Sequence, residues 1–250
     1  MIPQLDLGPI DLQTFGLVLA LALIADGLIV AKRLAELGKP VDWAYESVFA
    51  AGVGGVVGAK LDWMLQNSEQ AFDGSLANAV FGPGLVFFGG LLGGALAVCL
   101  WAYHRNFLGL QLLDLAAPAV ALGYAIGRIG CQLSGDGDYG VASDLPWAMA
   151  YPDGTVPTTV EVHPTPIYET LAMGSATIVL WHLRGRLARG LLFGLYLVIA
   201  GVERFLIEFI RRNEEVVAGF TLPQLISVGM VVAGAAFIAW RVRAARLATA

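Results

Sequence analysis

The sequence is poor in charged residues. Of its 250 residues, 14% are charged and 57% are hydrophobic, and the mean hydropathy is +0.71. Water-soluble globular domains usually carry roughly a quarter charged residues. The composition therefore argues against a water-soluble globule and favours an integral membrane protein.

Cysteine and histidine are also scarce, with two and three copies. Cys99 and Cys131 are expected near opposite membrane faces, so no disulfide is predicted, because the Cα atoms of a disulfide lie within roughly 7 Å. No group of His, Cys, Asp and Glu residues has metal-ligand spacing, and neither a metal nor a cofactor is predicted. The last apolar segment has no lysine for a Schiff base, which excludes a retinal-type seven-helix protein.

Apolar segments long enough to cross a membrane dominate what is present. A helix needs about 20 mostly apolar residues to cross a hydrocarbon core about 30 Å thick. Seven such windows occur, at approximately 14–31, 44–61, 84–103, 112–131, 166–183, 190–209 and 222–241. They predict an all-α integral membrane protein of seven transmembrane helices that forms a single domain over 1–250, with one ordered outer loop at about 132–165.

The basic residues predict the orientation of these helices. Cytoplasmic loops collect Lys and Arg, and ten such residues follow the first, third, fifth and seventh windows: Lys32, Arg33, Lys39, Arg105, Arg184, Arg186, Arg189, Arg241, Arg243 and Arg246. The N-terminus is therefore predicted outside and the C-terminus in the cytoplasm. The net charge of −5 reflects acidic outer loops and gives no support to nucleic-acid binding.

Five cations do not follow this rule. They lie at the outer ends of the second, fourth and sixth windows: Lys60, Arg128, Arg204, Arg211 and Arg212. A charge within a membrane-spanning helix costs a few kcal/mol, so each is a candidate functional residue. The alternative is that they are anchors whose side chains extend to the lipid headgroups.

Three charged residues share a helix face in this set. Arg204, Glu208 and Arg211 stand at positions i, i+4 and i+7, which predicts an ionic strip. Such a strip is either structural or a binding site, because two guanidinium groups match phosphate oxygens in a bidentate manner.

The outer loop and the carboxylates give further candidates. His163 is the one histidine predicted outside, and it is either a packing residue or an acid–base group near neutral pH. Glu169 either balances an arginine or takes part in chemistry. Asp114 is predicted to cap its own helix, and Asp26 to face the bundle or a polar cavity.

Glycine spacing predicts close helix contacts. The runs GVGGVVG (52–58) and GGLLGG (89–94), and the glycines at 123, 127 and 130, allow helix backbones to approach one another.

The chain resembles the prolipoprotein diacylglyceryl transferases over nearly its whole length. The similar stretches are FGLVLALALIADGLIVAKR, GVGGVVGAKLDW, GGLLGG, DLAAPAVALGYAIGRIGC, HPTPIYE and RFLIEFIR. The resemblance implies a multi-pass enzyme of the bacterial inner membrane with its active site towards the outer side. It would transfer a diacylglyceryl group from phosphatidylglycerol to the lipobox cysteine thiol of a prolipoprotein signal peptide, with glycerol phosphate as the leaving group.

The resemblance also implies roles for individual residues. Arg128 and Arg204 match family arginines and are expected to bind the phosphate and assist its departure. Beside these two, the residues themselves suggest Lys60 and Arg211 as supporting cations, Asp136 in substrate binding and Glu208 as an orienting group. The base is expected to be His163 or Asp136, unless phosphate oxygens and Arg128 suffice. The expected partners are phosphatidylglycerol, prolipoproteins and membrane lipids, with no nucleic acid.

The chain departs from the family pattern around the fourth window and in the third. Cys131, Gln132, Ser134 and Asp136 replace the family's Asn, Phe, Asn and Glu, and one extra residue precedes Gly140. Phe88 stands where well-known members have a histidine. The alternative function is a catalytically weak relative that binds or moves anionic phospholipids.

Overall fold

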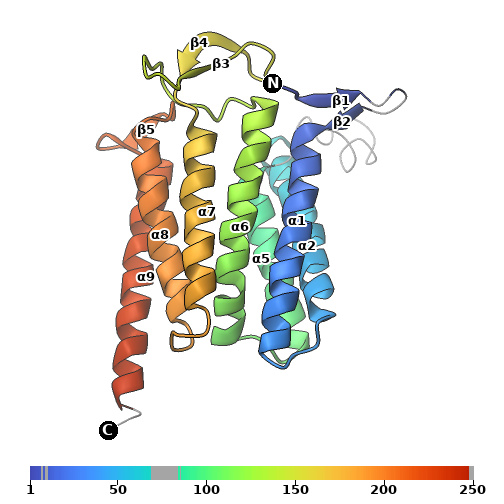
Figure 1. The fold of residues 1–250 in the computed structure, drawn as a ribbon, viewed down its shortest axis with the longest axis vertical. Helices are drawn as coiled ribbons and strands as arrows, with labels where there is room; N and C mark the ends of the chain where they lie inside the picture. The colour runs from blue at the N-terminus through green and yellow to red at the C-terminus, as the bar shows by residue number, and fades with distance from the viewer. Residues whose placement is uncertain (7, 9–10, 69–83, 85, 248–250) are drawn as a thin grey trace. The chain divides into compact units, whose positions relative to one another are not determined.

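A computed structural model of the chain describes residues 1–6, 8, 11–68, 84 and 86–247. Its helices are α1 (Thr14–Glu36), α2 (Trp43–Gln66), α5 (Phe87–His104), α6 (Leu110–Ser134), α7 (Thr165–Leu183), α8 (Leu191–Glu208) and α9 (Leu222–Leu247). A helix thus forms in every predicted window, and the all-helical class is confirmed for the described residues (Figure 1).

Three short antiparallel hairpins complete the described secondary structure. They pair β1 (Gln4–Asp6) with β2 (Asp11–Gln13), β3 (Met149–Tyr151) with β4 (Thr158–Val162), and β5 (Glu215–Val217) with β6 (Phe220–Thr221). The loop predicted at about 132–165 begins three residues later than predicted, because α6 continues through Ser134.

The helices have the length and surface of membrane elements. By length and composition, Thr14–Glu36, Trp43–Gln66, Leu110–Ser134 and Leu222–Ala244 can each cross a membrane, and α5 is a shorter apolar helix. Large apolar side chains point outward, with Leu65 81% exposed and Phe49 73% exposed. Such a surface is suited to lipid, where the α-helix satisfies its own backbone hydrogen bonds.

The chain divides into two compact units, residues 1–26 with 113–250, and residues 27–112. In the second unit, α2 and α5 pack through their glycines. A Cβ atom at Gly58 would overlap the carbonyl oxygen of Gly89, and one at Gly93 would overlap that of Gly54. The predicted close approach of these two glycine runs is therefore confirmed.

The first unit has its apolar core between α6, α7 and α8, which run side by side in Figure 1. Asp26 of α1 lies against Gly123 of α6, so its predicted inward orientation and the close contact at Gly123 are confirmed. Gly130 contacts Phe15 and Val18, also as predicted. The close contact predicted at Gly127 is wrong, because no described atom of another element comes within 4 Å of a Cβ placed there.

Asp114 caps a neighbouring helix instead of its own. Helix α6 begins four residues earlier, at Leu110, so the predicted N-cap is wrong. The Asp114 carboxylate accepts hydrogen bonds from the backbone N–H groups of Gly190 (2.6 Å) and Phe193 (3.1 Å). These are the free donors at the start of α8, and Asp114 thereby fixes α8 against α6.

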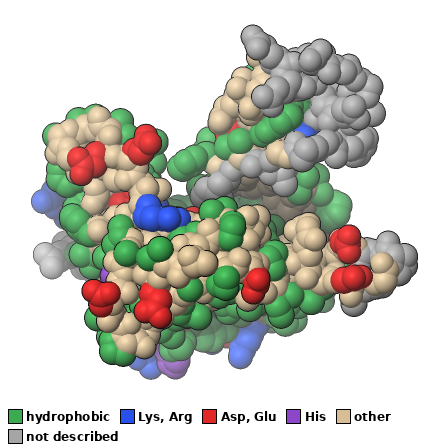
Figure 2. Space-filling model, turned by 90° about the horizontal axis from the view of Figure 1, so that it is seen from above, with side chains coloured by type: hydrophobic (Ala, Val, Ile, Leu, Met, Phe, Trp, Pro, Cys, Tyr) green, Lys and Arg blue, Asp and Glu red, His purple; other side chains and the backbone are tan. Residues whose placement is uncertain are grey.

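The segment after α6 is ordered by a small aromatic core. Tyr139 stacks on the fully buried Tyr151, with ring centres 4.7 Å apart. The Tyr139 hydroxyl donates to the carbonyl of Val156 (2.9 Å), and the Tyr151 hydroxyl donates to Gln132 Oε1 (2.9 Å). Acidic and basic side chains both appear on the face seen from this end (Figure 2).

Candidate functional site

Glu169 is the centre of a buried ionic cluster in the first unit. Its side chain, near the start of α7, is completely buried. Its carboxylate lies 3.2 Å from Arg128 Nε, 3.7 Å from Arg204 Nη1 and 3.4 Å from Arg211 Nη1. Three arginines from α6, α8 and the turn after α8 therefore converge on one carboxylate.

Two further carboxylates form ion pairs with these arginines. The two oxygens of Asp138 accept hydrogen bonds from Arg128 Nη1 and Arg211 Nη2. Glu208 pairs with Arg204 at 2.8 Å. Three guanidinium groups thus face three carboxylates, and the formal charges of these six groups cancel.

The predicted ionic strip is only half correct. The Arg204–Glu208 pair forms across one turn of α8, as the i, i+4 spacing predicts. Helix α8 ends at Glu208, so Arg211 is no longer on the helix face. It pairs with Glu169 and Asp138 instead.

Among the described residues, a buried guanidinium nitrogen of the cluster lacks an acceptor. Arg204 Nη1 is buried and forms no hydrogen bond to any described residue, since its 3.7 Å distance from Glu169 is too long for one. Buried N–H groups are normally paired. An oxygen of a ligand phosphate is the kind of acceptor that would satisfy it.

Tyr124 is a member of the site that the sequence analysis missed. Its hydroxyl donates to Glu169 Oε1 (2.8 Å) and accepts from Arg128 Nη2 (3.4 Å). The available signal was its position one helical turn before Arg128, which puts both side chains on one face of α6. Asp138 was also missed, although it shares the Gly/Asp turn with Asp136.

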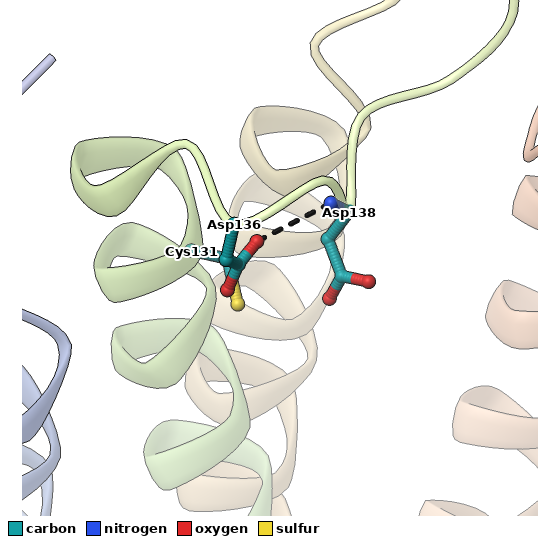
Figure 3. A group of neighbouring side chains, drawn as sticks. All are labelled: Cys131, Asp136 and Asp138. Atoms are coloured by element: carbon teal, nitrogen blue, oxygen red, sulfur yellow. Dashed lines mark hydrogen bonds between the residues drawn. The ribbon is translucent and has the colours of Figure 1, made fainter. Parts of the chain in front are cut away.

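Asp136 lies beside the thiol of Cys131 (Figure 3). Oxygens of Asp136 and Asp138 and the sulfur of Cys131 lie within 4.8 Å of one another, a grouping that the sequence spacing did not predict. These are donor types that bind cations, but two guanidinium groups already hold the Asp138 carboxylate and compete with any cation there.

The two aspartates of this turn differ in their ionisation. Burial raises the pKa of Asp136 above its ordinary value. Burial also acts to raise the pKa of Asp138, but the guanidinium groups of Arg128 and Arg211 outweigh it and hold that pKa below its ordinary value. Asp138 is therefore the carboxylate that stays ionised against the arginines.

His163 belongs to a separate polar chain. Its Nδ1 lies 3.4 Å from the hydroxyl of Tyr168, which accepts a hydrogen bond from Trp147 Nε1 at 2.7 Å. Its backbone pairs with Gly140 and Val141 and thus ties the start of α7 to the segment after α6.

The remaining predicted cations lie in different surroundings. Lys60 is buried on α2 in the second unit, with its Nζ 4.3 Å from the centre of the Trp63 ring. In the first unit, the Arg212 guanidinium lies 4.4 Å from the centre of the Tyr139 ring. The structure therefore brings together Arg128, Arg204, Arg211 and Glu208 of the predicted set.

Apolar helices with a buried guanidinium–carboxylate cluster at their ends are the features of a membrane protein, and guanidinium groups are of the type that recognises phosphate and carboxylate. The family model of the prolipoprotein diacylglyceryl transferases matches residues 4–240. The chain belongs to this family, as its sequence resemblance indicated.

Curated relatives match over most of their length. Three of them are phosphatidylglycerol–prolipoprotein diacylglyceryl transferases. The protein from Clostridium tetani is 30% identical, over 92% of this chain and 93% of its own length. That from Azotobacter vinelandii is 32% identical, over 98% of both chains. That from Chromohalobacter salexigens is 33% identical, over 94% of this chain and 90% of its own.

Proposed function

We propose that this chain is a phosphatidylglycerol–prolipoprotein diacylglyceryl transferase, which catalyses the first step of lipoprotein maturation. The observation that carries the proposal is the convergence of Arg128, Arg204 and Arg211 on Glu169, in a chain whose relatives bear this name over nearly their whole length. The chain is a bacterial membrane protein.

The reaction moves one negative charge onto a phosphate. The sulfur of the prolipoprotein cysteine, as thiolate, forms a bond to the glyceryl carbon of phosphatidylglycerol. The bond between that carbon and the phosphate oxygen breaks, and its electron pair stays on the oxygen, so glycerol phosphate leaves with one more negative charge than the lipid phosphate had. The thiol proton goes to a base. Fixed cations at the oxygen stabilise this developing charge in the transition state.

Arg128 and Arg204 are the residues that we assign to the phosphate. Arg204 offers the buried Nη1 that has no acceptor among the described residues. Arg128 offers a guanidinium held in place by Tyr124 and Glu169. Glu208 orients Arg204 through their 2.8 Å pair.

The remaining assignments concern the substrates and the surroundings of the phosphate. Arg211 and Lys60 act as supporting cations, Asp136 contributes to substrate binding, and His163 is the proposed base. No residue of the enzyme needs to serve as the nucleophile, because the thiol comes from the lipobox cysteine of the substrate.

The membrane arrangement forms part of the same proposal. All seven helices cross the bacterial inner membrane as a single domain, with the N-terminus outside and the C-terminus in the cytoplasm. The segment at about 132–165 then lies on the outer side, where phosphatidylglycerol and the cysteine of the signal peptide meet the site. The net charge of −5 gives no support to nucleic-acid binding.

A reconstituted assay tests the function. Purified protein in vesicles that contain phosphatidylglycerol is incubated with a lipobox peptide, and the peptide mass is measured. We expect the mass of one diacylglyceryl group to be added, and the variant Arg186→Gln, changed in an exposed turn, to behave like the wild type. An unmodified peptide under conditions where the lipid binds would instead support the alternative of a lipid-binding relative.

A further inference from the structure

A polar cavity adjoins the ionic cluster. Its volume is about 340 Å³, within the range of small-molecule sites. Its lining comes from the turn after α6 and the turn after α8: Gly137, Asp138, Tyr139, Arg211, Arg212 and Asn213.

The two arginines of the cavity lining have different contacts. Arg211 has a side chain that is only 8% exposed, and it extends from the cavity wall to Glu169 and Asp138 of the cluster. Arg212 forms no ion pair with any described carboxylate, and its guanidinium lies over the Tyr139 ring. With Asp138 counted, the lining carries one net positive charge, which favours an anion.

Arg212 is exposed, and its guanidinium lies over a ring that is itself rigidly held. Tyr139 is stacked on Tyr151 and bonded to the carbonyl of Val156, and Tyr151 is completely buried. A cation–π contact on a ring held in this way limits the freedom that Arg212 would lose on binding a ligand.

Asn213 connects the cavity to the other end of the cluster. Its Nδ2 donates to Glu208 Oε1 at 2.7 Å, and Glu208 pairs with Arg204. This bond fixes the orientation of the amide. A ligand in the cavity thus meets groups joined to the cluster through both Arg211 and Asn213.

We propose that this cavity is the subsite that receives glycerol phosphate after it has left Arg128 and Arg204, and that Arg212 and Asn213 determine the specificity of this product subsite. The inference rests on the proposed function and names the place that the leaving group occupies after transfer. A leaving phosphate with an additional negative charge is favoured next to Arg212, because the lining of the cavity carries one net positive charge. The polyol hydroxyls suit the amide of Asn213 and the carboxylate of Asp138, which pair with hydroxyl groups.

Glycerol phosphate itself is the probe for the test. Its binding is measured by calorimetry on the full-length protein, and its inhibition constant is measured in the transfer assay. We expect Arg212→Gln to raise the dissociation constant and the inhibition constant of glycerol phosphate by about tenfold or more, as for a lost charge-assisted hydrogen bond. Arg212→Lys is expected to restore part of this loss. Asn213→Ala is expected to reduce the preference for glycerol phosphate over inorganic phosphate.

The control is Arg186→Gln, which is expected to leave both constants unchanged. Equal constants in the wild type, Arg212→Gln and Arg186→Gln would overturn the subsite. So would transfer by a wild type that binds no glycerol phosphate at millimolar concentration. Binding that depends on Arg212 in a protein without transfer activity would support the subsite and contradict the proposed function.

Discussion

Arg128 Nε lies 3.2 Å from the completely buried carboxylate of Glu169. Arg128 is on α6 and Glu169 on α7, 41 positions later in the chain by residue number. The pair joins two helices at the point where Arg204 and Arg211 also arrive. Glu169 therefore keeps three cations close together that would otherwise repel one another.

Arg204→Gln tests the unsatisfied donor. The variant removes a guanidinium group that we assign to the leaving phosphate, and loss of one such transition-state contact lowers kcat by about 10²- to 10³-fold. Arg204→Lys keeps the charge without the planar fork and is expected to recover part of the rate. Steady-state transfer kinetics provide the measurement, with Arg186→Gln as the control. Wild-type kcat in Arg204→Gln would remove Arg204 from the chemistry.

Glu169→Gln tests the centre of the cluster. The change leaves a positive charge without its buried partner, which costs about 3–5 kcal/mol in proteins and corresponds to a fall in Tm of roughly 10 °C for a chain of this size. Thermal unfolding in detergent measures it. The matched control is Glu161→Gln on the exposed side of β4, where no change is expected; an equal Tm for both variants would contradict the central role of Glu169.

Asp138→Asn tests the pH dependence of the cluster. The pKa of Asp138 is held below its ordinary value of 3.8, so its ionised form stabilises the folded protein above that pH, and this contribution is lost as the pH falls through the lowered pKa. The wild type is therefore expected to exceed Asp138→Asn in Tm at neutral pH, with a difference that disappears in strong acid.

Asp136→Asn tests a pH dependence of stability opposite to that of Asp138, in the same turn. The pKa of Asp136 is raised above 3.8, so the stability that it contributes is present at low pH and is lost as the pH rises through the raised pKa. The Tm of Asp136→Asn relative to that of the wild type is thus expected to rise with pH. Parallel pH profiles of Tm for the two variants would refute the assignment of their carboxylates.

Gly58→Ala tests the packing of α2 on α5. An added Cβ meets the backbone of Gly89 and the Cα of Gly93, and neither can move without displacing a helix. Overpacking of this kind costs about 1–3 kcal/mol. Gly174→Ala on α7, where a Cβ has nothing within 4 Å, is the control in a thermal-unfolding experiment. A Gly58→Ala variant as stable as Gly174→Ala would disprove the close contact.

The sequence predicted the helices and most of the cations for reasons that are local. Apolar windows of this length predict helices from their own residues alone. A cation at a helix end predicted outside can be recognised from the distribution of Lys and Arg along the chain. Arg128 and Arg204 could be identified in this way, as could the Arg204–Glu208 pair on one helix. The glycine runs likewise predicted the contact between α2 and α5.

The partners of these residues depend on which helices pack together, and helix packing joins residues that are far apart in the sequence. Glu169 could be weighed as a counter-ion, but its contacts with three arginines required the packing of α6, α7 and α8. The sequence predicts a cap by Asp114 on its own helix because its partner, Gly190, is 76 positions away. The spacing predicts Arg211 on a helix face because nothing in it marks the end of α8 at Glu208.

A structure of the protein with phosphatidylglycerol bound in a lipid nanodisc tests the central claim most directly. The measured quantity is the distance from the lipid phosphate oxygens to the guanidinium nitrogens of Arg128 and Arg204. We predict that both arginines lie within hydrogen-bond distance, about 3 Å, of one phosphate group, with Arg204 Nη1 among the donors. A phosphate bound away from this pair, or the two arginines pointing into separate environments, would contradict the account.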